Sequence, residues 1–116
     1  MDEIQKKNIC AVLDSSGVDL RKALDAHFRD LNLSKPVPED YQLLDSTIST
    51  IHEGIWTSEE PELEYDKLKS EVYKVLIDER RAKAEEPEAY VGENEAVERD
   101  RAIIDFTFNW LRCLLR

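Results

Sequence analysis

The chain has 116 residues, enough for one ordinary domain with its own hydrophobic core. Its 26 acidic and 16 basic residues give a formal net charge of −10, and a field of this sign disfavours direct binding to nucleic acid or to an anionic membrane. The three glycines and four prolines are too few for a turn-rich β-sandwich or barrel, so the composition favours an all-α fold.

Neither a membrane span nor a secretion signal is predicted, because no 18 consecutive residues are apolar and residues 1–10 are mostly polar or charged. Cys10 and Cys113 lie among apolar residues at helical spacing, which predicts two buried, reduced thiols. A disulfide between the first and last helices is the alternative. Together these features predict a cytoplasmic protein.

Apolar residues recur at helical spacing in five stretches, and we predict a helix in each: residues 2–13, 18–31, 38–54, 59–83 and 95–115. In the second stretch they recur at intervals of 4, 4 and 3, at Leu20, Leu24, Phe28 and Leu31. In the third they form the narrow stripe of an antiparallel bundle helix, at Tyr41, Leu44, Ile48, Ile51 and Ile55.

Capping and turn residues separate these stretches. Ser16, followed three residues later by Asp19, is similar to a capping box at the start of the second helix. Thr57 or Ser58 is predicted to cap the fourth helix. Residues 84–93 contain a proline and a glycine and are predicted to form the loop before the last helix.

The last stretch carries two apolar stripes. One consists of Val97, Ile104, Phe108, Leu111 and Leu115, and the other of Ile103, Phe106, Trp110, Cys113 and Leu114. A helix that is apolar over so much of its circumference should contact neighbours on two sides. We therefore predict an all-α, compact, single-domain bundle of about five helices in which the C-terminal helix is central.

Negative charge is concentrated in residues 84–100, which contain seven acidic residues and one basic residue. One interpretation is an acidic contact surface centred on Tyr90 and Val91, because a tyrosine ring supplies buried area and carboxylates steer a basic partner. Its predicted partner-binding residues are Glu85, Glu86, Glu88, Tyr90, Glu93 and Glu95. The alternative is a solvated loop followed by acidic residues at a helix start, where the helix dipole favours them.

The sequence offers no recognisable catalytic motif, since it lacks a glycine-rich phosphate loop and a GxSxG nucleophile motif. His27 and His52 fall on different predicted helices, each at the edge of an apolar face, and neither follows a glutamate by three residues. These histidines and the two cysteines lack the spacing of a zinc site. We therefore predict neither an enzyme nor a bound metal or cofactor.

Binding to another protein is the function that these features favour. We predict an acidic module that neutralises a basic partner, such as a toxin, a nuclease or a nucleic-acid-binding defence protein, as an inhibitor of the immunity type or by imitating the charge of DNA. In size, charge and helicity the chain is similar to the helical immunity proteins of nuclease colicins. The alternative is a structural subunit, or a homodimer, that associates through the last helix, Trp56 and Trp110.

Overall fold

The computed structural model describes residues 1–62, 64–84, 88, 90 and 95–114. Its helices are α1 (Glu3–Ser15), α2 (Gly17–Asp30), α3 (Pro38–Thr57), α4 (Tyr65–Lys83) and α5 (Glu95–Leu114). No strand occurs in these described ranges. The predicted all-α class is confirmed, and a helix is present in each of the five predicted stretches.

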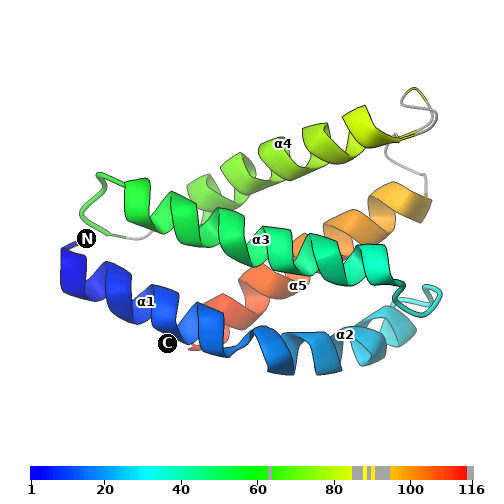
Figure 1. The fold of residues 1–116 in the computed structure, drawn as a ribbon, viewed down its shortest axis with the longest axis horizontal. Helices are drawn as coiled ribbons and strands as arrows, with labels where there is room; N and C mark the ends of the chain where they lie inside the picture. The colour runs from blue at the N-terminus through cyan, green and yellow to red at the C-terminus, as the bar shows by residue number, and fades with distance from the viewer. Residues whose placement is uncertain (63, 85–87, 89, 91–94, 115–116) are drawn as a thin grey trace.

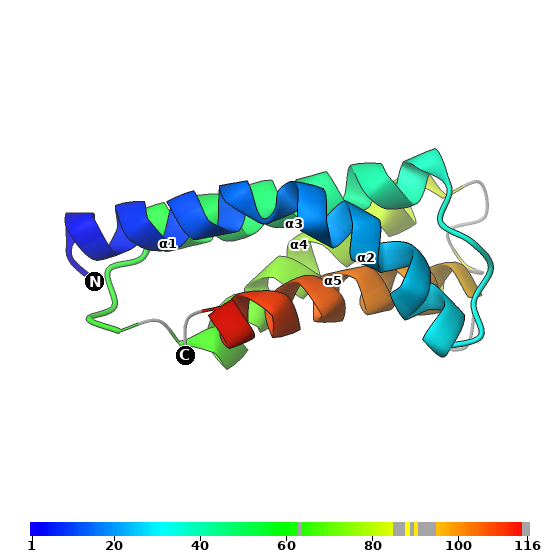
Figure 2. The ribbon, with the colours of Figure 1, turned by 90° about the horizontal axis from the view of Figure 1, so that it is seen from below.

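The helices run up and down as an antiparallel bundle whose first member is broken in two (Figure 1). α1 and α2 run in the same general direction, α3 returns beside α1, and α4 and α5 follow as a second antiparallel pair. From below, α1 and α3 form one layer and α5 another, while α2 and α4 run obliquely between them (Figure 2). Helices that are consecutive in the chain are therefore packed against each other.

α3 and α5 share the centre of the bundle. α5 packs against α2, α3 and α4, as its two apolar stripes predict. α3 packs against all four other helices and is therefore as central as α5. The large side chains that are fully buried between the helices include Leu13, Leu20, Leu24, Phe28, Leu44, Ile51, Ile55, Ile103, Ile104 and Leu111. Burying one such side chain stabilises a fold by about 1.5–3 kcal/mol, so this cluster is the main stabilising feature.

Ser16 ends α1 and begins α2 while keeping right-handed backbone angles, φ −82° and ψ −11°. Its hydroxyl donates to the carbonyl of Val12 at 2.8 Å, one turn back. The predicted capping box with Asp19 is therefore wrong, because the Ser16 side chain does not cap α2. A capping box lies instead at the start of α1, where the side chains of Asp2 and Gln5 each accept the other's backbone N–H, at 2.8 and 3.1 Å.

α3 is longer and α4 shorter than the sequence predicts. α3 continues to Thr57 instead of ending at residue 54, and Ser58 ends it in an extended conformation. The Ser58 hydroxyl accepts the backbone N–H of Glu60 at 3.2 Å, so it caps a turn of the connector and not the start of α4. α4 consequently begins at Tyr65, six residues after the predicted start.

Asn32 closes α2 in the left-handed region of the backbone, with φ 58°. The N–H of Asn32 donates to the carbonyl of Arg29 at 3.1 Å, and the N–H of Leu33 donates to that of Phe28 at 2.9 Å. These paired bonds are those of a Schellman motif, and asparagine tolerates the left-handed conformation better than most residues other than glycine. The motif satisfies the last carbonyls of α2 and turns the chain toward α3.

A buried ion pair joins the N-terminal part of α5 to the first turn of α3. Arg99, 12% exposed, pairs with Asp40, 4% exposed. Arg99 also donates to the carbonyls of Ser34 and Lys35, at 2.8 and 3.0 Å, and its guanidinium lies 4.7 Å from the centre of the Phe28 ring. One cation therefore holds the α2–α3 connector against α5.

The two cysteines differ in exposure. Cys10 is 3% exposed, as predicted, and its burial, with a smaller contribution from the Asp14 carboxylate, raises the pKa of the thiol. Cys113 is exposed, so the prediction of a second buried thiol is wrong. It follows Phe106 and Trp110 along the outer side of α5, and these two side chains are only partly buried. Both thiols are free.

Candidate binding groove

Tyr90 lies in the core and not on the surface. Its side chain is 5% exposed, and its hydroxyl donates to Oδ2 of Asp100 at 2.5 Å. Asp100, 2% exposed, also accepts a hydrogen bond from Nε of Arg80 at 3.2 Å. The prediction that Tyr90 is the centre of an exposed contact surface is therefore wrong. The hydrogen bond to Asp100 offsets the cost of burying the Tyr90 hydroxyl away from water, so the whole side chain can lie in the core.

The other residues predicted for this surface are only partly described. Glu88 and Glu95 are exposed, and Oε1 of Glu95 lies 3.5 Å from the hydroxyl of Ser34. Outside the described residues lie Glu85, Glu86, Val91 and Glu93. For the five glutamates, the acidic contact surface stays a prediction.

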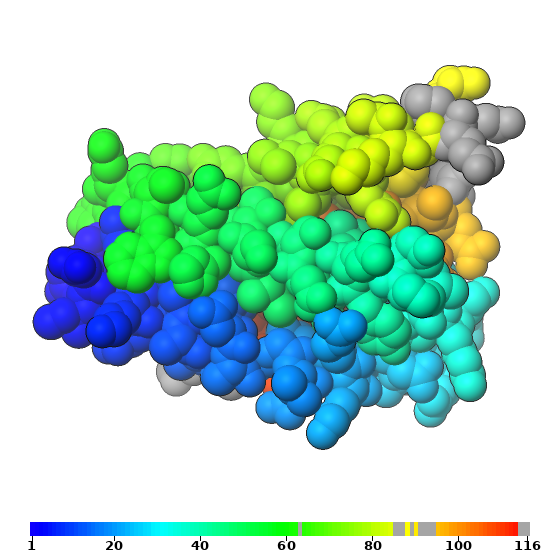
Figure 3. Space-filling model, viewed as in Figure 1, coloured from blue at the N-terminus to red at the C-terminus, as the bar shows by residue number. Residues whose placement is uncertain are grey.

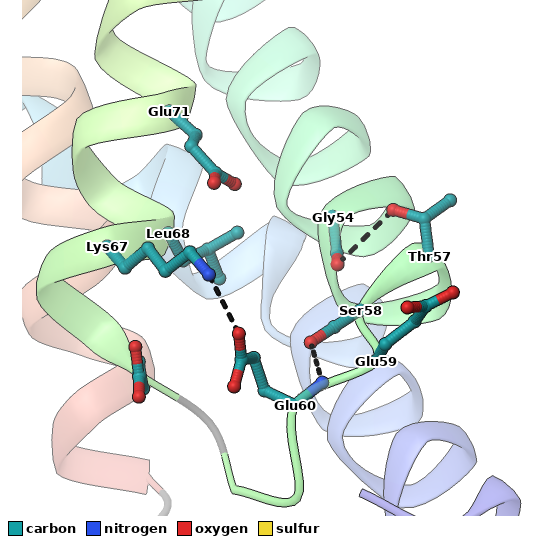
Figure 4. Close-up of a pocket in the computed structure, with 9 residues that line it drawn as sticks. Gly54, Thr57, Ser58, Glu59, Glu60, Lys67, Leu68 and Glu71 are labelled. Carbon is teal, nitrogen blue, oxygen red and sulfur yellow. Dashed lines mark hydrogen bonds and ion pairs between the residues drawn. The ribbon is translucent and has the colours of Figure 1, made fainter.

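A groove lies between α3 and α4, next to the connector that joins them; Figure 3 shows this face of the molecule, and Figure 4 shows the groove in close-up. Two adjoining hollows of about 320 and 360 Å³ form it. We call this surface the α3–α4 groove, and it is lined by Thr50, Glu53, Gly54, Thr57, Ser58, Glu59, Glu60, Glu64, Lys67, Leu68, Glu71, Val72 and Val75. Both hollows open to solvent, which suits the side chains of a partner better than an enclosed small molecule.

The floor of the α3–α4 groove is apolar. On α4 it consists of Leu68, Val72 and Val75, spaced by 4 and 3 residues, of which Val75 is 54% exposed. On α3 it includes Gly54, toward which the Leu68 side chain is directed (Figure 4). A Cβ at residue 54 would lie 2.6 Å from Cδ1 of Leu68, so glycine lets the two helices approach closely at this point.

Carboxylates surround this floor. The charged residues that line the groove are Glu53, Glu59, Glu60, Glu64, Glu71 and Lys67. Nζ of Lys67 lies 2.8 Å from Oε1 of Glu60. This hydrogen-bonded ammonium lowers the pKa of the Glu60 carboxyl, and the carboxylate in turn raises the pKa of Lys67. With five glutamates and one lysine among its described lining residues, the groove carries a net negative charge.

Cations from the start of the chain hold the connector in place without neutralising its carboxylates. Nζ of Lys6 donates to the backbone carbonyls of Trp56 and Ser58, at 3.1 and 2.7 Å. The ammonium of Met1 donates to the backbone carbonyl of Glu60. Because these groups bind backbone carbonyl oxygens, Met1 and Lys6 position the connector that lines one end of the groove.

The predicted helix over residues 59–83 would place Glu59, Glu60 and Glu64 in its first turns. In the structure they lie in the connector between α3 and α4 and line the same hollow as Gly54. The available signal was an acidic run that follows a helix with a glycine near its end. That signal does not show which face of α4 lies opposite Gly54, so the groove could not be located from it.

Both histidines lie at the edge of the core, as predicted. The His27 ring stacks on Phe106 with centroids 4.7 Å apart, and Nε2 of His52 lies 3.5 Å from Oδ2 of Asp14. Among the described residues, no three or more histidine, cysteine, aspartate or glutamate side chains come together as a metal site would require. In the same part of the chain, no helix has the length and apolar character needed to cross a bilayer.

No protein-family model matches the chain, and no curated protein or solved structure is significantly similar to it.

Proposed function

We propose that this chain is a protein-binding module that holds a basic segment of another protein in the α3–α4 groove. The observation that carries the proposal is an exposed valine, Val75, in a hollow that Glu53 of α3 and Glu71 of α4 also line. Val75, more than half exposed, offers apolar area to a partner, and the surrounding glutamates attract lysine and arginine side chains.

The charge within the groove supports a cationic partner. Lys67 already shows that a groove carboxylate accepts an ammonium group at 2.8 Å. The glutamates beside it are exposed, so they attract a basic protein from a distance and raise its association rate. The net charge of −10 acts in the same direction over the whole surface.

We propose that the module acts as an inhibitor, which neutralises its basic partner by binding it. Elsewhere on α4, acidic and basic side chains alternate and pair, as Glu79 does with Lys83 at 3.1 Å and Asp78 with Arg81 at 3.9 Å. Imitation of DNA would call for long rows of carboxylates, whereas the groove is a local patch. The local patch supports an inhibitor more than a DNA mimic.

The proposal is tested by titrating the isotope-labelled chain with a short capped peptide of leucine, alanine and lysine while its amide signals are followed. We expect the largest shifts at the α3–α4 groove. Reversing two charges on its walls, Glu53→Lys with Glu71→Lys, should weaken binding about tenfold at about 0.1 M salt, where charges more than about 10 Å apart are screened.

A matched control carries the same change in net charge on α2, which is remote from the groove: Asp19→Lys with Asp30→Lys. Both aspartates are exposed, and we expect less than about a twofold effect. Equal weakening by the two double variants would mean that only the overall field attracts the peptide. Shifts centred on residues 84–95 would move the binding site to the surface predicted from the sequence.

Self-association is a second candidate function, and one observation favours it. The outward stripe of α5 exposes Cys113 and leaves Phe106 and Trp110 only partly buried. Trp56 is also 38% exposed. Sedimentation velocity over a wide concentration range decides between the two, because a monomer at all concentrations contradicts a structural subunit built on a homodimer.

A further inference from the structure

We infer that the occupant of the α3–α4 groove is an amphipathic α-helix with lysine or arginine on both sides of a short apolar stripe. This inference rests on the proposed function and identifies the form and chemistry of the partner segment. It follows from the nature of the two walls, from the spacing of the floor residues and from the placement of the carboxylates.

Both walls of the hollow that contains Val75 are helices, α3 and α4, whose backbone groups are largely bonded within each helix. An extended segment needs main-chain partners, such as those at the edge of a sheet, and the described residues contain no strand. In this hollow an extended segment would meet side-chain groups such as those of Thr50 and Thr57, but no row of backbone partners for its N–H and C=O groups. A helix brings its own backbone hydrogen bonds, so it can cover the groove without that cost.

The floor follows helical rows on both walls. On α4 the row is Leu68, Val72 and Val75, and on α3 Gly54 and Thr57 are spaced by one turn. Leu68 and Val72 are buried in the bundle, so Val75 is the side chain of the α4 row that a third helix would contact as it packs along the two rows. Gly54 adds no side chain to the α3 row, and the Leu68 side chain of α4 fills the space beside it.

The carboxylates determine where the cations of the third helix must lie. Glu53 comes from α3 and Glu71 from α4, so they approach the floor from opposite walls. A helix that places its apolar stripe on the floor therefore turns both of its flanks toward glutamates. The matching sequence has apolar residues at i, i+4 and i+7, with lysine or arginine at the positions beside them.

Two capped peptides of identical composition test this inference. One places its leucines at i, i+4, i+7 and i+11 with lysines beside them, and the other alternates leucine and lysine as a strand would. We expect the first peptide to bind about tenfold more tightly and to gain helical circular dichroism on binding. Val75→Ser should weaken its binding about fivefold. Ile4→Ser, which removes a side chain that is 73% exposed and outside the groove, should leave it unchanged.

The outcomes separate the inference from the proposed function. If the alternating peptide binds the groove as tightly, or if the first peptide binds without gaining helix, the occupant is not a helix while the basic-segment function stands. If neither peptide shifts the amide signals of the groove, the proposed function fails and the inference fails with it. If Ile4→Ser and Val75→Ser weaken peptide binding equally, the apolar side chains of the peptide do not contact the groove.

Discussion

The hydroxyl of Tyr90 donates to Oδ2 of Asp100 at 2.5 Å, in a part of the bundle where both side chains are at least nine-tenths buried. Nε of Arg80 approaches the same oxygen at 3.2 Å from α4. One carboxylate of α5 thus binds a residue of α4 and a residue of the segment that joins the two helices. The contact anchors the Tyr90 side chain in the core, and its loss leaves a buried carboxylate with one donor fewer.

Tyr90→Phe should therefore lower the free energy of unfolding by about 1–2 kcal/mol, since a hydrogen bond to a charged buried group contributes more than a neutral one. Urea unfolding followed by circular dichroism measures this change. Tyr41→Phe is the matched control, because in the described part of the chain the Tyr41 hydroxyl has no hydrogen-bond partner. Equal losses in the two variants would contradict a stabilising bond to Asp100.

Alkaline pH should destabilise the fold through Tyr73 and Tyr90. Burial, followed by hydrogen bonds to Asp105 and Asp100, raises the pKa of each phenol above its ordinary value of 10.0. Each raised pKa contributes stability that is present below about pH 10 and is lost as the pH rises above that value, because the unfolded chain then releases protons that the folded chain keeps. The loss approaches about 1.4 kcal/mol per pH unit for each tyrosine.

Urea unfolding between about pH 9 and pH 11 checks the direction, and the ultraviolet absorbance of phenolate shows when each phenol ionises. Replacing both residues, Tyr73→Phe with Tyr90→Phe, should flatten the pH dependence. If all the tyrosines of the folded wild-type chain ionise near pH 10, as judged by the full rise in phenolate absorbance, the raised pKa values of Tyr73 and Tyr90 are contradicted.

The ion pair of Arg99 and Asp40 predicts a large effect of removing one partner alone. Arg99→Met should destabilise the chain by about 3–5 kcal/mol, because the Asp40 carboxyl group would remain buried without its cationic partner. The double variant Arg99→Met with Asp40→Leu should recover part of this loss. Denaturant unfolding of the two single variants and the double variant measures the coupling. Additive losses would mean that the two side chains do not stabilise each other.

Much of the fold could be predicted because helical periodicity is a local property. The stripe that contains Leu20, Leu24 and Phe28 predicts both the helix and its buried face, and all three side chains are fully buried. The errors occur where one side chain has two possible partners. Ser16 and Ser58 are good caps by residue type, yet their hydroxyls bond to Val12 and Glu60, and sequence spacing does not decide between such alternatives.

The candidate site was much harder to predict, because it depends on contacts between distant parts of the chain. Tyr90 is surrounded by glutamates in the sequence, and only its contacts with Asp100 and Arg80 show that it is buried. The groove likewise depends on how Gly54 of α3 packs against Leu68 of α4. The proposed attraction of a basic protein can be inferred from charge alone, whereas the surface proposed for it can be located only from the packing of the helices.

The two thiols should react at very different rates. Cys113 is exposed and should react with a disulfide reagent such as Ellman's reagent in the native state. Cys10 is buried and the pKa of its thiol is raised, so it should react only when the chain opens or unfolds. Cys113→Ser should remove the fast phase and Cys10→Ser the slow phase. Two equally fast phases would contradict the burial of Cys10.

Lys67 should act as a built-in competitor for the cations of a partner. Its ammonium occupies Glu60 at 2.8 Å, so a lysine or arginine of the bound segment must displace it or bind beside it. Lys67→Gln removes this competitor and one positive charge from the groove. It should therefore tighten binding of the leucine-lysine peptide about threefold at low salt. At about 0.5 M salt, where charges are screened, it should have little effect. Lys22→Gln on α2 changes the net charge equally, is also exposed, and should change affinity by less than half as much. Weaker peptide binding by Lys67→Gln would show that Lys67 supports the groove wall and does not compete. Equal tightening by Lys67→Gln and Lys22→Gln would show that only the net charge of the chain affects binding.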